Sequence, residues 1–257
     1  MKEIANSKYL PLGAAVLGGA ALVLRWLLYA VAVDEKGLLP VGHPLEMAVW
    51  VVTALALLYI LVMVWRLDGS DLYEDNFSAS QGSCWGHIAA GAAILWTVMG
   101  NVPLMPGRLG GFWQLLGYAS PVCLAWAGSA RRQGKQPFFA LHLVPCLFLV
   151  MHIVNYYQTW SGNPQLQDYF FTLFGTMALM FFAFYTTAFD VGGGKRRMQL
   201  GMGLAAVYLL TAELATSDYP WLYLGGIVWA WTDLCTLYPK PKPEPEEAAG
   251  TEAGKEG

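Results

Sequence analysis

Residues 9–33 read YLPLGAAVLGGAALVLRWLLYAVAV, an apolar stretch whose single charged side chain is Arg25. A helix needs about 20 consecutive apolar residues to cross the hydrocarbon core of a bilayer, so the stretch predicts a membrane-spanning helix. It is too long for the apolar core of a cleaved signal peptide, and it lacks a clear small-residue cleavage site. We therefore expect this helix to be part of the folded protein.

The rest of the chain repeats the same pattern. Of its 257 residues, 56% are hydrophobic and 13% are charged, whereas a soluble domain carries about 25% charged residues. We therefore expect an all-α, polytopic integral membrane protein with about eight transmembrane helices, which fill residues 1–238 and leave no room for a sizeable soluble domain. The predicted spans are 9–33, 47–65, 85–104, 109–129, 137–158, 168–189, 198–216 and 221–238.

Three connecting or terminal segments complete this organisation. The short turn 104–110 leaves two interpretations open, namely a simple turn between two full spans or part of a re-entrant segment. The loop DGSDLYEDNFSASQGS (68–83) is acidic and polar, and we expect it to lie in the cytoplasm. The tail PKPKPEPEEAAGTEAGKEG (239–257) is rich in Pro and Glu. Because it contains too little apolar surface to fold, we expect a disordered cytoplasmic tail.

The basic residues predict the orientation of the chain. If both termini are cytoplasmic, 12 of the 15 Lys and Arg residues lie inside, two (Lys36 and Arg108) lie outside, and Arg25 lies within a span. Cytoplasmic loops of membrane proteins carry such an excess of Lys and Arg. Most of the asymmetry comes from the short clusters ARRQGK (130–135) and GGGKRR (192–197). We predict an N-in, C-in topology.

Cysteine and histidine usage argues against a cofactor or a metal. No CxxC occurs, so we expect neither a disulfide framework nor a thiolate zinc site. Near the predicted inner helix ends, His87 and His142 come from different helices and are of the type that ligates haem iron, but no CxxCH is present. Asp190 and Asp233 close their spans at the same side, and we interpret them as solvated helix ends.

Arg25 is the residue that the membrane environment does not explain. An arginine at the centre of a membrane-spanning helix costs about 2.5–3.5 kcal/mol on insertion scales. Arg25 precedes the outer end of its span by eight residues, or about 12 Å at 1.5 Å per residue. Its long side chain can extend toward the outer headgroups, form a structural ion pair or bind a ligand. The sequence leaves these roles open.

Two carboxylates lie at a suitable depth to pair with Arg25. Glu213 lies in the outer turn of the seventh predicted span, at a helix C-terminus where the helix dipole disfavours a negative charge. Glu46 begins the second span in VGHPLE (41–46), where Pro44 suits the first turn and the dipole favours a carboxylate. Because only Glu46 has a local explanation, we expect Glu213 to be the counter-ion of Arg25 and rank Glu46 second.

The fifth predicted span carries polar residues at the same depth. In PFFALHLVPCLFLVMHIVNYYQTW (137–160), His152 and Tyr156 are four residues apart and share a helix face, with Asn155 beside them. Together with Arg25 and Glu213, they are predicted to form an outward-facing polar pocket between helices. The competing interpretation is an interfacial aromatic belt, with hydrogen bonds that only join helices.

Three stretches carry a resemblance to a known group of proteins: RWLLYAVAVDEKGLLPVGHPLE (25–46), YQTWSGNPQLQDY (157–169) and AFDVGGGKRR (188–197). They resemble an uncharacterised family of multi-pass membrane proteins from anaerobic, gut-type Firmicutes. The resemblance implies a bacterial cytoplasmic membrane as the location. It brings no known activity with it.

Three functional hypotheses follow. The first is binding or transport of a polar or anionic small molecule, or of a lipid headgroup, through the outer pocket. The second is a membrane-embedded lipid-modifying enzyme, in which His152 is the general base and Arg25 holds a phosphate or carboxylate. The third is a structural or accessory subunit with an exposed groove of small residues. The expected partners are the lipid bilayer and a small-molecule or lipid ligand, and no nucleic acid.

Overall fold

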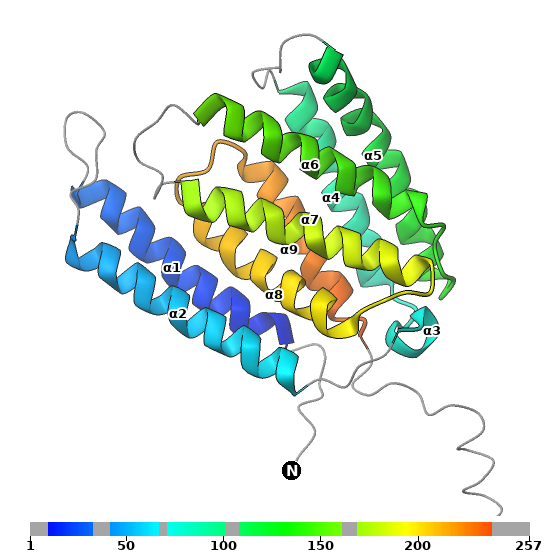
Figure 1. Ribbon diagram of the computed structural model, residues 1–257, viewed down its shortest axis with the longest axis horizontal. Helices are drawn as coiled ribbons and strands as arrows, with labels where there is room; N and C mark the ends of the chain where they lie inside the picture. Colours follow the sequence, from blue (N-terminus) through cyan, green and yellow to red (C-terminus); the bar gives the residue numbers. More distant parts are fainter. Residues whose placement is uncertain (1–9, 33–41, 67–70, 101–107, 161–168, 238–257) are drawn as a thin grey trace, which may run out of the picture.

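The computed structural model describes residues 10–32, 42–66, 71–100, 108–160 and 169–237, which form an all-helical bundle (Figure 1). Within these ranges there is no strand, only an isolated bridge between Phe77 and Leu237. The helices are α1 (Leu10–Ala32), α2 (Pro44–Trp65), α3 (Tyr73–Asn76), α4 (Gln81–Met99), α5 (Arg108–Arg132), α6 (Ala140–Trp160), α7 (Phe170–Asp190), α8 (Arg196–Glu213) and α9 (Pro220–Leu234).

The predicted all-α fold is confirmed for the described residues. Each of the eight predicted segments overlaps one long helix, with ends that differ by up to five residues, and only the short α3 was not predicted. Helices α4 and α5 both run along the bundle, packed against each other. The turn that joins them at 101–107 and the predicted disordered tail 239–257 lie outside the described residues.

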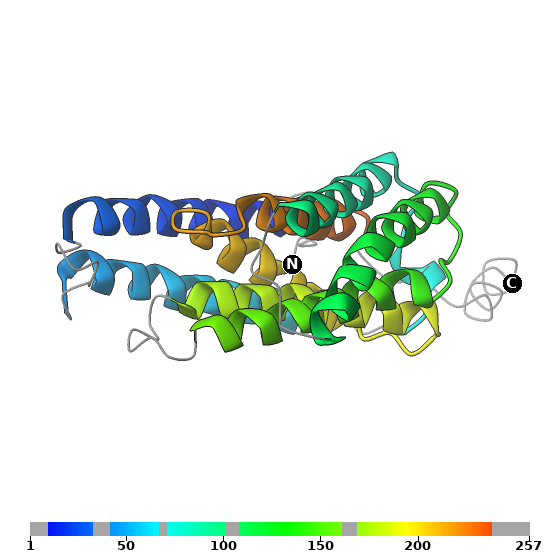
Figure 2. The ribbon, with the colours of Figure 1, turned by 90° about the horizontal axis from the view of Figure 1, so that it is seen from above.

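Helix α8 occupies the centre of the bundle. It packs against α1, α2, α7 and α9, while α4 packs against both α5 and α9, and α6 lies between α5 and α7. Viewed from above, α1, α9 and α4 form one layer, and α2, α7 and α6 form the other (Figure 2). The core lies between them and is built largely from α7, α8 and α9, which contribute Phe182, Leu204 and Trp229, among others.

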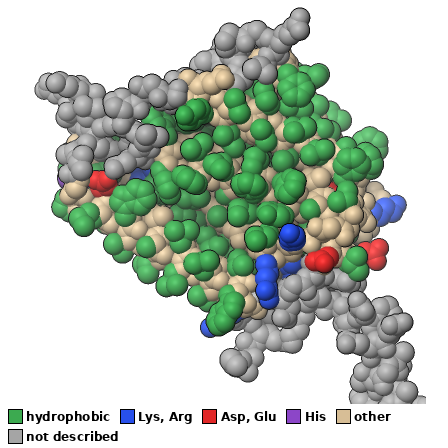
Figure 3. Space-filling model, viewed as in Figure 1, with side chains coloured by type: hydrophobic (Ala, Val, Ile, Leu, Met, Phe, Trp, Pro, Cys, Tyr) green, Lys and Arg blue, Asp and Glu red, His purple; other side chains and the backbone are tan. Residues whose placement is uncertain are grey.

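Four helices are long and apolar enough to cross a membrane: α1, α2, α6 over 140–158, and α7. The other long helices are less apolar or shorter, yet α4 and α5 also expose large apolar side chains, among them Trp96, Leu115 and Trp126. Apolar side chains cover most of the face shown in Figure 3, and most of the charged ones gather at its lower right. These features indicate an integral membrane protein, because water disfavours such a surface.

Small residues let several helices approach closely. A Cβ atom on Gly18 of α1 would lie 2.9 Å from Cβ of Thr211 on α8, and one on Gly86 of α4 would lie 1.8 Å from Oγ1 of Thr232 on α9. Likewise, a Cβ atom on Gly128 of α5 would lie 3.0 Å from Cβ of His87 on α4. Small residues at helix interfaces are typical of membrane bundles, where packing replaces the hydrophobic effect as the driving force.

The long helices alternate in direction, so their termini gather at two ends of the bundle. The Arg25 end contains the C-termini of α1, α4, α6 and α8. The Arg131 end contains the C-termini of α2, α5, α7 and α9 together with α3, and it lies at the lower right of Figure 1. Each end holds a cluster of buried polar side chains.

Candidate functional site

At the Arg25 end, the expected pairing of Arg25 with Glu213 is confirmed. Arg25 Nη2 lies 3.0 Å from Glu213 Oε2 and donates to Thr216 Oγ1 at 2.7 Å. Thr172 donates to the other carboxylate oxygen of Glu213, and the guanidinium lies 4.3 Å from the centre of the Phe171 ring. Arg25 and Glu213 are 4% and 3% exposed. The positive charge of Arg25 is therefore matched by a protein carboxylate and shielded from solvent.

Glu46, the second-ranked partner, has a different contact. Its Oε2 accepts a hydrogen bond from the backbone N–H of Gly42 at 3.0 Å, one turn before it in the chain. The neighbouring His43 precedes α2, and its Nδ1 accepts from Leu45 N–H at 3.3 Å. Glu46 and His43 thus satisfy backbone donors at the start of α2, as capping residues do.

The three residues of α6 differ in their surroundings. Tyr156 lies beside Thr172 and within electrostatic range of Glu213, so it belongs to the Arg25 cluster. His152 is buried between the rings of Phe148 and Tyr219, and neither of its ring nitrogens has a hydrogen-bond partner among the described residues. Asn155 is also buried and makes a contact of its own.

The described contacts of Arg25 and Glu213 form no open pocket, and the predicted outward-facing pocket stays a prediction, because the segments 33–41 and 161–168, which follow α1 and α6, lie outside the described residues. Arg25 and Glu213 are buried against each other, and the three cavities described below are lined by other residues. His152 makes no hydrogen bond to the pair within the described part of the chain. This end of the bundle has the geometry of a structural ion pair.

At the Arg131 end, two histidines from different helices are hydrogen-bonded to each other. Nε2 of His87 on α4 lies 3.0 Å from Nε2 of His142 on α6. On the far side of its ring, His142 Nδ1 lies 2.6 Å from Oδ2 of Asp190 on α7. His87 Nδ1 lies 2.8 Å from the backbone carbonyl of Ser83. A continuous chain of four groups therefore runs across three helices.

A second carboxylate and an arginine lie beside this chain. Ser83 Oγ donates to Asp233 Oδ1, which lies 3.7 Å from His87 Nδ1. Arg131 Nη2 lies 3.7 Å from Asp233 Oδ2, too far for a hydrogen bond, and none of the three guanidinium nitrogens has a hydrogen-bond partner among the described residues. The guanidinium instead stacks on Phe77, 4.0 Å from the ring centre, and on Tyr73, at 5.1 Å.

The interpretation of Asp190 and Asp233 as solvated helix ends is wrong. Asp233 is 0% exposed and Asp190 is 9% exposed, because other elements pack over the ends of their helices. Trp229 covers both histidines, with its ring centre 5.6 Å from that of His87 and 6.2 Å from that of His142. The close packing at Gly86 and Gly128 brings α4 against α9 and α5, which places His87 between them.

Part of the loop predicted to be polar and cytoplasmic covers this cluster. Tyr73 and Phe77 are both buried, and burial raises the pKa of the Tyr73 phenol, which therefore stays neutral. Two backbone hydrogen bonds hold the segment, from Ser78 N–H to the Thr236 carbonyl at 3.1 Å and from Ser80 N–H to the Arg131 carbonyl at 3.4 Å. The two aromatic residues at i and i+4 in an acidic loop are the sequence signal that could have indicated this cap.

A cavity of about 460 Å³ lies at the turn between α5 and α6. It is lined by polar residues, including Ser129 and Lys135, with Trp126 and Phe138 as apolar walls. Gln136 also lines it, and its side-chain amide donates to the carbonyl oxygens of Phe189 at 3.1 Å and of Asp190 at 2.9 Å. Gln136 thus lies between this cavity and Asp190, whose carboxylate is hydrogen-bonded to His142.

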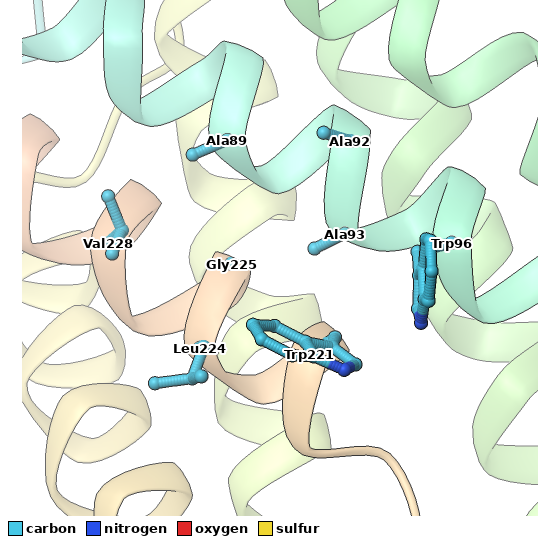
Figure 4. Close-up of a pocket in the computed structure, with 8 residues that line it drawn as sticks. All are labelled: Ala89, Ala92, Ala93, Trp96, Trp221, Leu224, Gly225 and Val228. Carbon is cyan, nitrogen blue, oxygen red and sulfur yellow. The ribbon is translucent and has the colours of Figure 1, made fainter.

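A second cavity of about 460 Å³ is an apolar groove between α4 and α9 (Figure 4). Its floor consists of small residues, including Ala89, Ala93 and Gly225, and Trp96 and Trp221 stand at one end of it. Both tryptophans are largely exposed. A third, smaller cavity of about 100 Å³ adjoins this end and contains Asp218.

The haem possibility finds no support in the geometry of the two histidines. Their Nε2 atoms are hydrogen-bonded directly to each other, whereas two axial ligands lie on opposite sides of an iron. Within the part of the chain that the structure describes, no group of three His, Cys, Asp or Glu side chains is arranged to hold a metal ion.

Comparisons with protein-family models, with curated proteins and with solved structures found no match to this chain.

Proposed function

We propose that the chain crosses a membrane eight times, with the Arg131 end in the cytoplasm. The eight long helices alternate in direction, and α4 and α5 present large apolar side chains outward as the four most apolar helices do. The excess of Lys and Arg in the segments at the Arg131 end supports this orientation. The family resemblance favours the cytoplasmic membrane of a bacterium as its location.

We further propose that the protein binds or transports a small polar or anionic molecule at the Arg131 end. The observation that carries this proposal is Arg131, a fully buried guanidinium that has no hydrogen-bond acceptor among the described residues. Buried polar groups are nearly always hydrogen-bonded, and a guanidinium matches the two oxygens of a carboxylate or phosphate. We thus keep the predicted binding function, but we place the ligand-binding arginine at Arg131 and not at Arg25.

The surroundings of Arg131 favour coupling of ligand binding to proton binding. Asp190, His142, His87 and Asp233 form a buried titratable cluster around it. Ionisable residues inside a membrane bundle typically mark substrate pathways and proton relays. An anion that approaches Arg131 also approaches the carboxylate of Asp233, so a proton taken up by the cluster favours its binding.

The experiment is a thermal-stability screen of the purified chain in detergent, with inorganic phosphate, acetate, succinate and citrate as probes. At least one anion is expected to raise the Tm of the unmodified protein. Arg131→Gln is expected to abolish that shift. Arg132→Gln is the matched control, because Arg132 is the exposed neighbour in the same turn. Equal shifts in both variants would contradict the assignment of Arg131.

An accessory subunit is the second candidate, because the groove in Figure 4 is the exposed small-residue groove that this hypothesis predicts. Ala92→Leu would fill part of the groove, because Ala92 lines it and its side chain is exposed. If the protein is an accessory subunit, this change reduces its co-purification with a partner from crosslinked membranes. The enzyme alternative has less support, because the described residues give His152 no hydrogen-bonded nucleophile.

A further inference from the structure

The hydrogen-bonded chain at the Arg131 end has acceptors at both of its outer ends. The carboxylate Oδ2 of Asp190 faces His142 Nδ1 at 2.6 Å. At the other end, the backbone carbonyl of Ser83 faces His87 Nδ1 at 2.8 Å. Between them, the two Nε2 atoms face each other at 3.0 Å. Each of these three contacts needs one hydrogen atom between its two heavy atoms.

Counting the hydrogen atoms gives a definite protonation state. A neutral imidazole carries one N–H, and an ionised carboxylate carries none, so two neutral histidines and one carboxylate supply only two hydrogens. The Ser83 carbonyl supplies none, which forces His87 to donate through Nδ1. The Asp190 contact uses the second hydrogen. The Nε2 atoms would then meet with two lone pairs at hydrogen-bonding distance.

We infer that the His87–His142 pair holds one additional proton, shared between the two Nε2 atoms, so that the pair is an imidazole–imidazolium couple balanced by Asp190. This proton is a feature of the site that does not depend on which ligand binds Arg131. Placing the same proton on Asp190 would leave both rings neutral, with the same total charge for the three groups, so the state of the rings distinguishes that arrangement from the shared proton.

The charges around the pair favour the additional proton. Asp233 and Arg131 are the other charged groups that act on His87, and Asp190 acts on His142 directly. Asp190 contacts His142 directly and Asp233 lies 3.7 Å from His87, so a carboxylate lies against each ring and the shared proton is balanced by the carboxylate in contact with the pair. Tyr73 and Trp229 also face the site but stay neutral. Arg196, which begins α8 and is buried at this end, is not among the charges that act on His87 and makes other contacts.

A metal ion would satisfy the same two nitrogens in a different way. Histidines that bind metals usually donate their other ring N–H to a carboxylate or a backbone carbonyl, as both rings do here. However, two Nε2 atoms bound tetrahedrally to zinc at about 2.0–2.1 Å would lie roughly 3.3 Å apart. The observed 3.0 Å is the ordinary length of a hydrogen bond. A metal-bridged pair is therefore an outcome that the experiment must separate from a shared proton.

The experiment is nitrogen NMR of the ¹⁵N-histidine-labelled protein in lipid bilayers at about pH 8.5, two units above the ordinary histidine pKa. The chain has four histidines, so His87→Gln and His142→Gln are enough to assign the pair. We expect Nδ1 of both rings to carry hydrogen and the two Nε2 signals to share a third. His43 and His152 should show neutral rings. Two neutral rings at His87 and His142 would overturn the inference, as would signals that shift on adding Zn²⁺ or a chelator.

A second measurement does not depend on assigning spectra. Unfolding the protein with SDS at the same pH in weakly buffered solution should release about one proton per chain more from the unmodified protein than from His142→Gln, because the separated histidines are neutral in the unfolded state and the cysteines contribute equally to both proteins. His43→Gln, which removes a histidine at the start of α2, should release as much as the unmodified protein. Equal release from all three proteins would overturn the inference.

Discussion

The two ends of the bundle each bury one arginine, and they use it differently. Arg25 has a carboxylate at 3.0 Å and a hydroxyl at 2.7 Å. Arg131 has a carboxylate at 3.7 Å, makes no hydrogen bond among the described residues and is covered by two aromatic rings. Burial alone therefore does not distinguish a structural charge from a functional one. The hydrogen-bond partners do distinguish the two, because a guanidinium that already donates to protein acceptors has fewer N–H groups left for a ligand.

The largest expected effect comes from breaking the ion pair at the Arg25 end. Glu213→Leu should lower the free energy of unfolding by about 3–5 kcal/mol, because it leaves Arg25 buried and uncompensated. The double variant Arg25→Leu, Glu213→Leu should recover most of this loss. Denaturant titration in bicelles measures both. Glu46→Gln is the control, and its effect should stay below about 1 kcal/mol, since it weakens only a helix start. A loss no larger for Glu213→Leu than for Glu46→Gln would contradict the structural role.

At the other end, Arg131→Gln should cost less stability than Glu213→Leu. Arg131→Gln removes the cation that lies 3.7 Å from Asp233 but no hydrogen bond, and the carboxylate of Asp233 keeps its bond from Ser83. The expected loss is about 1–3 kcal/mol, the usual cost of leaving a buried polar group less well satisfied. The same bicelle titration measures it. If Arg131→Gln destabilised the protein as strongly as Glu213→Leu, the distinction between the two arginines would not hold.

Helix packing at the Arg131 end offers a third test. Gly86→Val should destabilise by about 1–3 kcal/mol, because its Cβ would lie 1.8 Å from Thr232 Oγ1 and force α4 away from α9. Gly111→Ala on α5 is the matched control, since a Cβ there meets nothing within 4 Å. That change should stabilise by about 0.5–1 kcal/mol through helix propensity. Thermal unfolding of the two variants should therefore shift in opposite directions.

The smallest effect is expected from pH, at the Arg25 end. Partial burial raises the pKa of Asp218, which lies between α8 and α9. The folded chain therefore binds this proton more tightly than the unfolded chain. The resulting stabilisation is present below the unfolded pKa and is lost as pH rises through the folded one. Asp218→Asn should flatten the fall in Tm between about pH 4 and 6. If Tm falls as steeply with pH in Asp218→Asn as in the unmodified protein, Asp218 is not the source of that fall.

The fold could be read from the sequence because it depends on long apolar runs. Each of eight such runs overlaps one long helix, and the pairing of Arg25 with Glu213 followed from depth in the membrane and from the helix dipole. Both arguments use properties of a single helix or of its position along the membrane normal. Neither requires knowledge of which helices are neighbours.

The site at the Arg131 end could not be predicted in the same way. Arg131 lies in a basic cluster that signals orientation, and Asp190 and Asp233 lie at helix ends that are usually solvated. Their burial results from the contacts of α3 and of five helices whose order in space the sequence does not specify. The sequence places His87 and His142 on two different helices, but their hydrogen bond depends on the close approach of helices at Gly86 and Gly128.

The two arginines can be compared in one assay. The anion-induced rise in Tm should be measured for the unmodified protein, for the double variant Arg25→Leu, Glu213→Leu, and for Arg131→Gln. The double variant should keep the rise, because Arg25 is only structural, and Arg131→Gln should lose it. Loss of the rise in the double variant, with a full response in Arg131→Gln, would instead show that the anion binds at Arg25.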